Sequence, residues 1–180
     1  MADAMIPYLY ELGAEAVISP EKMEKNKTLM QIYTTLKEWA ASHSAEGLIS
    51  FDLNWCNRSY TRFRTPFMDH LFPDALGTKS GWNSPNHCFY EIVNQTGNSA
   101  YIQLALSSKE MPQDQLEICD RINELYPSKN NKPEWKWRNP FRTESISIDD
   151  VNDKDAIFLK LDECLKSVWK FEEELKDKRL

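Results

Sequence analysis

A chain of 180 residues fits one domain of ordinary size, and folding buries roughly 70% of the surface that an unfolded chain of this length exposes. The content of 41% hydrophobic and 12% aromatic residues excludes a disordered chain and makes a disulfide or a metal unnecessary for stability. The net charge of -6 is unevenly spread, because residues 1–54 and 143–180 are acidic whereas residues 55–142 have a small basic excess. We expect a single domain over residues 1–180.

The cysteines and the start of the chain indicate the compartment. None of the cysteines forms a Cys-x-x-Cys pair or lies at ligand spacing from a histidine pair, so we interpret them as free thiols in a reducing compartment. They are Cys56, Cys88, Cys119 and Cys164. Residues 1–15 contain acidic but no basic side chains, which argues against a signal or transit peptide, and no apolar run approaches the roughly 18 residues of a membrane span. These features predict a cytoplasmic protein with no membrane partner.

Three main helices are expected. The first begins at Pro20, because Ser19 can cap the free amides and proline suits the first helical position. Apolar residues at spacings of three and four continue this helix to about Ser42. The other two are expected over 113–126 and 153–177, with a further short helix over 5–17.

The strands are predicted from alternating apolar and polar residues. Residues 48–53 and 58–65 alternate in this way and form either two strands or one bent strand. The clearest hairpin joins residues 88–94 and 100–106, which are too apolar for an exposed edge. Short strands are expected at 135–138 and 144–148. The fold class is therefore α+β, an antiparallel sheet of about four to six strands packed against three main helices.

Catalytic and metal motifs are missing from the sequence. We find no glycine-rich phosphate loop, nucleophile elbow or kinase signature, and the three histidines show no ligand spacing. The sequence thus predicts no cofactor, no metal and no catalytic residue. Glu91 interrupts an apolar strand, and it is either a functional acid or a side chain on a wet sheet face beside Gln103. The alternative function is an orphan enzyme with a site near Asp69, His70 and Glu91.

Basic and aromatic residues give the main functional signal. One alternating run is expected to share a strand face, and a loop and a second basic stretch add to it. The candidate binding residues are Arg58, Tyr60, Arg62, Arg64, Lys79, Trp82, Trp135, Lys136, Trp137 and Arg138. Cations neutralise phosphates and aromatic rings stack on unpaired bases, so this set suits nucleic acid. The other interpretation is that the arginines pair with acidic helices, for example with Glu172 and Glu173.

The run Ser80-Gly81-Trp82-Asn83, followed by residues 89–94 and a second apolar strand, resembles the region after the catalytic core in some PD-(D/E)XK nuclease-superfamily proteins of prokaryotic defence systems. The resemblance covers about residues 65–178. The nuclease motif is absent, because Glu91 has no lysine two residues later. The resemblance implies a non-catalytic module that accompanies or inhibits a nuclease, carried by a prokaryote or a phage.

These observations lead to one functional hypothesis. The chain is expected to be a non-enzymatic macromolecular interaction module, nucleic-acid-associated or acting in a phage or defence context as an accessory subunit or inhibitor. Its partner is either a protein or a nucleic acid, single-stranded or duplex. A protein-directed inhibitor that binds through its acidic helices is a third possibility.

Overall fold

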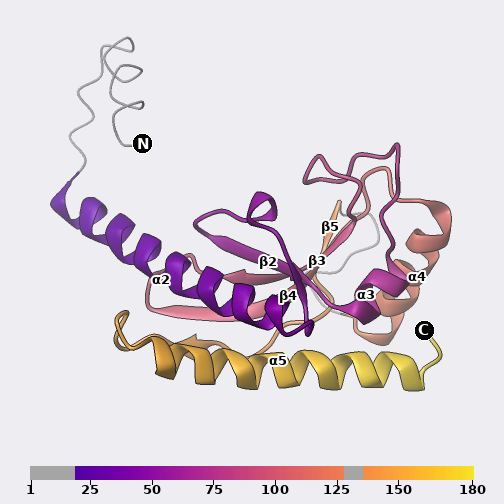
Figure 1. Ribbon diagram of the computed structural model, residues 1–180. Helices are drawn as coiled ribbons and strands as arrows, with labels where there is room; N and C mark the ends of the chain where they lie inside the picture. The colour runs from indigo at the N-terminus through magenta and orange to yellow at the C-terminus, as the bar shows by residue number, and fades with distance from the viewer. Residues whose placement is uncertain (1–18, 128–135) are drawn as a thin grey trace, which may run out of the picture.

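The computed structural model describes residues 19–127 and 136–180 (Figure 1). Within these residues the chain is α+β, with a six-stranded antiparallel sheet and the long helices packed on one of its faces, which confirms the predicted fold class. Figure 1 shows α5 running beneath the sheet, with α2 crossing toward it from the N-terminal side. The short helix predicted over 5–17 lies outside the described residues.

Side chains cap the start of three of the described α-helices, and the fourth, Gln113–Leu125, follows Pro112 without a side-chain cap. The Ser19 hydroxyl accepts a hydrogen bond from the Lys22 amide (3.3 Å), and the Asp153 carboxylate accepts one from the Ala156 amide (3.0 Å). A short helix that the sequence did not predict follows Thr65, whose hydroxyl accepts from the Met68 amide. The helices are α2 (Pro20–Ala45), α3 (Pro66–Leu71), α4 (Gln113–Leu125) and α5 (Lys154–Asp177).

The sheet has the order β1-β2-β3-β4-β5, and β6 pairs with the other end of β4. Its strands are β1 (Ser50–Phe51), β2 (Tyr60–Arg64), β3 (Cys88–Val93), β4 (Ser99–Ser107), β5 (Trp137–Arg138) and β6 (Ile146–Ser147). The strand expected over 48–53 is shorter than predicted, because the chain turns into a 3-10 helix, η1 (Leu53–Trp55). The Asp52 carboxylate accepts from the Asn54 amide at 2.8 Å and favours this turn over extension.

Alternation along the central strands gives the sheet two different faces. Phe63, Tyr90 and Leu104 belong to the hydrophobic core shared with the helices. The residues next to them on β2, β3 and β4 point to the opposite side, which we call the outer face. There Glu91 lies opposite Gln103, as the hairpin prediction required, and Arg62 lies opposite Glu91 on its other side. The outer face therefore has polar side chains on strands that are otherwise apolar.

One carboxyl group is buried in the core beneath the sheet. Glu172 on α5 is only 4% exposed, and its Oε1 accepts a hydrogen bond from the Thr65 hydroxyl at 2.5 Å. Burial raises the pKa of Glu172, and interactions with the hydroxyls of Thr65 and Tyr90 oppose part of that rise. The folded protein consequently holds a proton on Glu172 more tightly than the unfolded chain does.

We expect Glu172→Gln to alter how stability depends on pH. Because the pKa of Glu172 is raised on folding, its contribution to stability is fully present below the unfolded pKa and is lost as pH rises through the folded pKa. A neutral glutamine keeps an oxygen for Thr65 and removes this loss. The free energy of unfolding of the variant minus that of wild type should therefore be more positive at about pH 8 than at about pH 5. Urea unfolding at the two pH values measures this difference.

Glu173→Gln is the matched control, since Glu173 is the exposed neighbour that pairs with Lys176 at 2.6 Å. Its difference from wild type should stay within about 0.5 kcal/mol at both pH values. Equal pH profiles for the two variants would contradict a raised pKa at Glu172.

Candidate functional site

A pocket of about 310 Å³ lies on the outer face of the sheet. Its size is at the low end for small-molecule sites, so it suits a group as large as one ring system. The strands β2 to β5 and the segments next to them supply its lining, which consists of Tyr60, Arg62, Trp82, Glu91, Gln103, Ala105, Trp137 and Asn139. The pocket combines aromatic walls with a polar floor.

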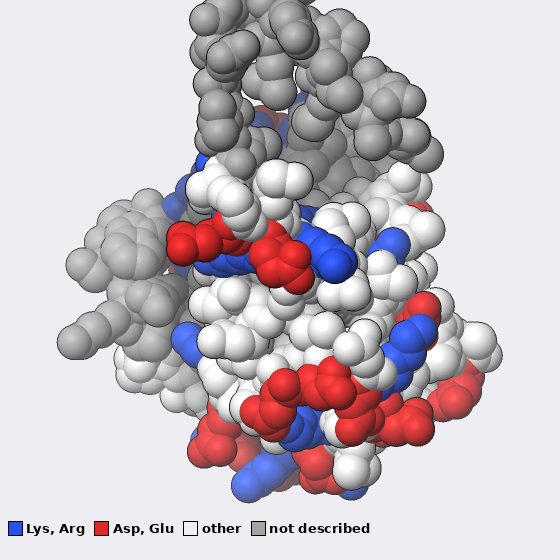
Figure 2. Space-filling model, turned by 90° about the vertical axis from the view of Figure 1, so that its left-hand side faces the viewer, with Lys and Arg blue, Asp and Glu red and all other residues white. Residues whose placement is uncertain are grey.

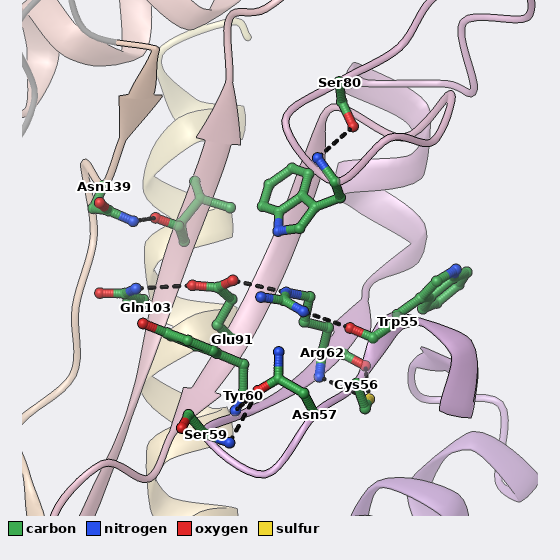
Figure 3. A network of polar contacts seen from close by, with 12 residues as sticks. Trp55, Cys56, Asn57, Ser59, Tyr60, Arg62, Ser80, Glu91, Gln103 and Asn139 are labelled. Atoms are coloured by element: carbon green, nitrogen blue, oxygen red, sulfur yellow. Dashed lines mark hydrogen bonds and ion pairs between the residues drawn. The ribbon is translucent and has the colours of Figure 1, made fainter. Parts of the chain in front are cut away.

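The floor is a row of bonded polar side chains that crosses three strands (Figure 3). The Arg62 Nε donates to Glu91 Oε1 at 2.8 Å, and the Gln103 Nε2 donates to Glu91 Oε2 at 2.9 Å. The Arg62 Nη1 donates to the carbonyl of Trp55 at 2.6 Å. Glu91 is only 5% exposed, so the wet sheet face expected from the sequence is in fact a buried ion pair. The positive charge of Arg62 compensates the negative charge of the Glu91 carboxylate.

Aromatic rings form the walls. The indoles of Trp82 and Trp137 meet edge to face with centroids 4.6 Å apart, and Trp82 also packs edge to face on Phe89 at 4.9 Å. The Arg62 guanidinium lies 5.0 Å from the Tyr60 ring centroid and 5.8 Å from that of Trp82. These contacts place a cation between two rings at one side of the pocket.

Gly81 sets the position of the loop that carries Trp82. Its amide donates to the Ser107 hydroxyl at 2.7 Å, which fixes the loop next to the end of β4. A Cβ at this position would lie 2.3 Å from two ring atoms of Trp137. The loop and β5 therefore come together as closely as they do only because residue 81 has no side chain.

The structure brings together four of the predicted binding residues, namely Tyr60, Arg62, Trp82 and Trp137. Lys136 is exposed beside the pocket, with its ammonium 5.3 Å from the Trp137 ring centroid. Lys79 is also exposed, and its amide donates to Glu110 at 2.9 Å. Trp135 lies outside the described residues.

Three predicted arginines lie elsewhere. Arg58 precedes β2 in a turn and donates to Asn26 of α2 at 2.8 Å, so the expected single face from Arg58 to Arg64 is wrong. Arg64 is buried, and its guanidinium donates to the Phe72 carbonyl and pairs with the carboxylates of Asp69 and Asp74. Alternation describes only a straight strand, and β2 begins after Arg58.

Arg138 belongs to the helix side of the sheet. It pairs with Asp120 of α4, and its Nη1 lies 3.4 Å from the Cys119 sulfur. The arginines of β2 do form intramolecular pairs, but the expected partners on α5 are wrong, because Glu172 accepts from Thr65 and Glu173 pairs with Lys176. For Arg62 the partner is Glu91, which antiparallel pairing places directly opposite on β3.

Sequence reasoning missed Tyr101 and Asn139, which belong to the same face. The guanidinium of Arg142 lies over the ring of Tyr101 on β4, 3.6 Å from the ring centroid. Arg142 follows β5 and pairs through its backbone with Gln103, while Asn139 reaches the pocket from the same segment. The alternation of Tyr101 with Gln103 in the sequence was a usable signal for one shared face. The approach of residues 139–142 depends on tertiary pairing.

The residues of the enzyme alternative have separate partners. Asp69 pairs with Arg64 and Glu91 pairs with Arg62, while the His70 side chain is exposed. Burial raises the pKa of all four cysteine thiols, that of Cys119 to about 11, so they stay protonated at neutral pH. Among residues 19–127 and 136–180, no group of three or more His, Cys, Asp or Glu side chains is arranged to hold a metal ion.

Comparisons with protein-family models, with curated proteins and with solved structures gave no match to this chain. The fold and the pocket are therefore the basis for any statement about function. In the part of the chain that the structure describes, no helix is both long enough and apolar enough to cross a membrane.

We expect Gly81→Ala to destabilise the protein through its clash with Trp137. Forcing the indole aside should cost about 1–3 kcal/mol in urea unfolding. In a Trp137→Ala background the same substitution should cost far less, because the ring atoms 2.3 Å from the new Cβ are gone. The non-additivity of the two substitutions measures the contact.

Gly47→Ala provides the comparison. Gly47 has a positive φ of 75°, and a Cβ added there would meet no atom within 4 Å, so its cost is conformational and independent of Trp137. Additive costs for Gly81→Ala and Trp137→Ala, within about 0.5 kcal/mol, would show that the loop and β5 do not depend on this approach.

Proposed function

We propose that this chain is a non-catalytic binding module that holds single-stranded nucleic acid on the outer face of its sheet. The observation that supports the proposal is the convergence of Tyr60, Trp82 and Trp137 around one pocket with Arg62 at its floor. Proteins that bind single strands use aromatic rings as stacking platforms and cations along the backbone. Tyr101 with its stacked Arg142 extends this surface beyond the pocket.

The charges at the edge of the outer face suit a polyanion. Arg62 is neutralised by Glu91 and Arg64 by aspartates, so neither arginine is free for a phosphate. Lys136 and Arg142 are exposed beside the aromatic rings of Trp137 and Tyr101. The phosphate contacts of the proposal are therefore assigned to these two side chains.

The opposite charge gathers at another end of the molecule. Figure 2 shows the end at which α2 and α5 begin, where acidic groups form most of the lower band on this face. The exposed residues around the start of α5 include Asp149, Asp150, Asp153 and Asp155. A nucleic acid would be repelled there, which favours the outer face near β5 as its binding surface.

The sequence resemblance supports a context for this binding. A module similar to the region beyond a nuclease core, but without the nuclease motif, would serve as an accessory subunit or inhibitor in a phage or defence setting. Within that proposal the pocket would engage the displaced or single-stranded nucleic acid, and any protein partner would contact other surfaces.

We expect Trp137→Ala to weaken binding of a labelled single-stranded oligonucleotide roughly tenfold or more, because one stacking platform contributes about 1–3 kcal/mol. Lys136→Ala should weaken it as well and reduce the slope of log affinity against log salt by roughly 0.7, the value for one phosphate contact on a single strand. Fluorescence anisotropy across a salt series measures both effects.

Trp169→Ala on α5 is the matched control, since Trp169 and Trp137 are equally exposed, at 37%. It should leave the affinity unchanged. If the unmodified protein shows no binding even at low salt, or if duplex binds as tightly as single strand and both tryptophan variants behave alike, the proposed function fails.

A further inference from the structure

The pocket has a floor whose hydrogen-bonding groups can distinguish one base from another. We infer that it takes a single unstacked nucleobase and prefers guanine. This inference rests on the proposed function and goes beyond it, because stacking platforms alone are tolerant of sequence. It depends on which hydrogen-bonding positions of Arg62, Glu91 and Gln103 are still free.

The free acceptors come chiefly from Glu91. An ionised carboxylate has about four lone-pair sites, and each oxygen of Glu91 accepts one hydrogen bond, from Arg62 and from Gln103. One site on each oxygen therefore remains. The carboxylate lines the pocket and is 5% exposed, so a base donor that reaches it there meets a buried negative charge with little competing water.

Two amides add acceptors to the same floor. The side-chain nitrogens of Gln103 and Asn139 donate to Glu91 and to the Leu104 carbonyl, respectively. These bonds orient the amides, and their oxygens remain as acceptors in the residues that line the pocket. Each amide nitrogen also keeps one unused N–H, so among these floor residues only Glu91 contributes acceptors without donors.

The charged donor on the floor is Arg62. A guanidinium has five N–H groups, of which Arg62 uses one at Nε for Glu91 and one at Nη1 for the Trp55 carbonyl. The remaining N–H groups belong to a side chain that also lines the pocket. A donor thus lies directly beside the acceptor carboxylate.

Guanine matches this arrangement best. Its pairing edge presents three N–H hydrogens, from N1 and the N2 amine, next to the O6 acceptor. As hydrogen-bond donors on the same edge, adenine and cytosine present only one amine group, and thymine presents only one N–H. The free acceptor sites on the two oxygens of Glu91, with the Arg62 guanidinium beside them, therefore satisfy guanine more fully, and a bidentate contact of this kind discriminates by about 1–3 kcal/mol.

The walls hold the base in the manner seen when a nucleotide is taken out of a stack. Flipped bases are read along their pairing edge while aromatic side chains contact their faces. Here Tyr60, Trp82 and Trp137 line the pocket around the floor, and the small side chain of Ala105 leaves room above β4. The 310 Å³ of space is large enough for one base.

The experiment uses labelled oligothymidine strands that carry one central guanine, adenine, inosine or abasic position, in DNA and RNA versions. Guanine should bind roughly tenfold more tightly than adenine, and the abasic strand should bind no better than adenine. Inosine lacks the N2 amine and should fall between guanine and adenine. Guanosine and adenosine monophosphates, titrated alone, test the pocket without the strand.

Two variants test the assignment to the pocket. Glu91→Gln replaces an acceptor by a donor and should reduce the preference for guanine to about onefold. Ala105→Leu fills the pocket from β4 and should lower the affinity for the guanine strand to that for the adenine strand. If Glu91→Gln does not fold, as judged by circular dichroism, Ala105→Leu and the monophosphates still decide the question.

The outcomes separate the two proposals. Strand binding that depends on Trp137 but shows equal affinity for guanine, adenine and abasic strands overturns the base pocket and leaves the binding module standing. Preference for guanosine monophosphate without any strand binding overturns the proposed function and makes the pocket a nucleotide site. Preference for guanine that survives Ala105→Leu places the recognition of the base elsewhere and overturns the inference.

Discussion

The buried ion pair between Arg62 and Glu91 constrains the outer face of the sheet. A single buried charge costs several kcal/mol, and removing one partner of such a pair typically destabilises a protein by about 3–5 kcal/mol. The pair therefore holds β2 in one register against β3, because a slip of β2 by one residue would turn Arg62 to the core face and leave Glu91 without its partner. Gln103 extends the same requirement to β4, since it satisfies the second carboxylate oxygen.

The same pair explains why the pocket is polar at its base and aromatic around it. Arg62 needs an acceptor outside the sheet, and the Trp55 carbonyl supplies it, which fixes η1 near the end of the outer face. The Trp55 ring then packs on the Phe89 ring with centroids 5.1 Å apart, and the Trp82 ring packs on the same Phe89 ring. The hydrogen bond from Arg62 to Trp55 therefore also positions the Trp55 ring for its packing on Phe89.

Arg62 and Arg64 show how neighbouring residues of one strand come to different roles. Both are paired with carboxylates, but Arg64 is closed off by Asp69, Asp74 and the Phe72 carbonyl, whereas Arg62 lines the pocket. The difference follows from α3 and the turn after it, which come back over Arg64. A ligand on the outer face therefore contacts Arg62 and not Arg64, and the Nε of Arg62 is already hydrogen-bonded to Glu91.

The central hairpin could be predicted from the sequence because its information is local. Residues 88–94 and 100–106 alternate, and Gly97 provides the positive φ of 83° that the connecting turn requires. The same holds for α2 and α5, whose capping residues and apolar spacing lie within each helix. The helix α3 was missed because its few residues contain too little periodicity to distinguish them from a loop.

The sequence by itself determined the fold class, the main elements and the placement of Glu91 opposite Gln103, since these follow from propensity, periodicity and one turn. It also identified Tyr60, Arg62, Trp82 and Trp137 as candidates, but not that they line one pocket. Only the tertiary structure decided this, because the pocket depends on strand order, on the close approach of Gly81 to Trp137 and on which carboxylate reaches each arginine. Contacts between residues far apart in the chain leave no periodic pattern in the sequence. For the same reason the sequence did not show that Glu91 is buried and paired with Arg62.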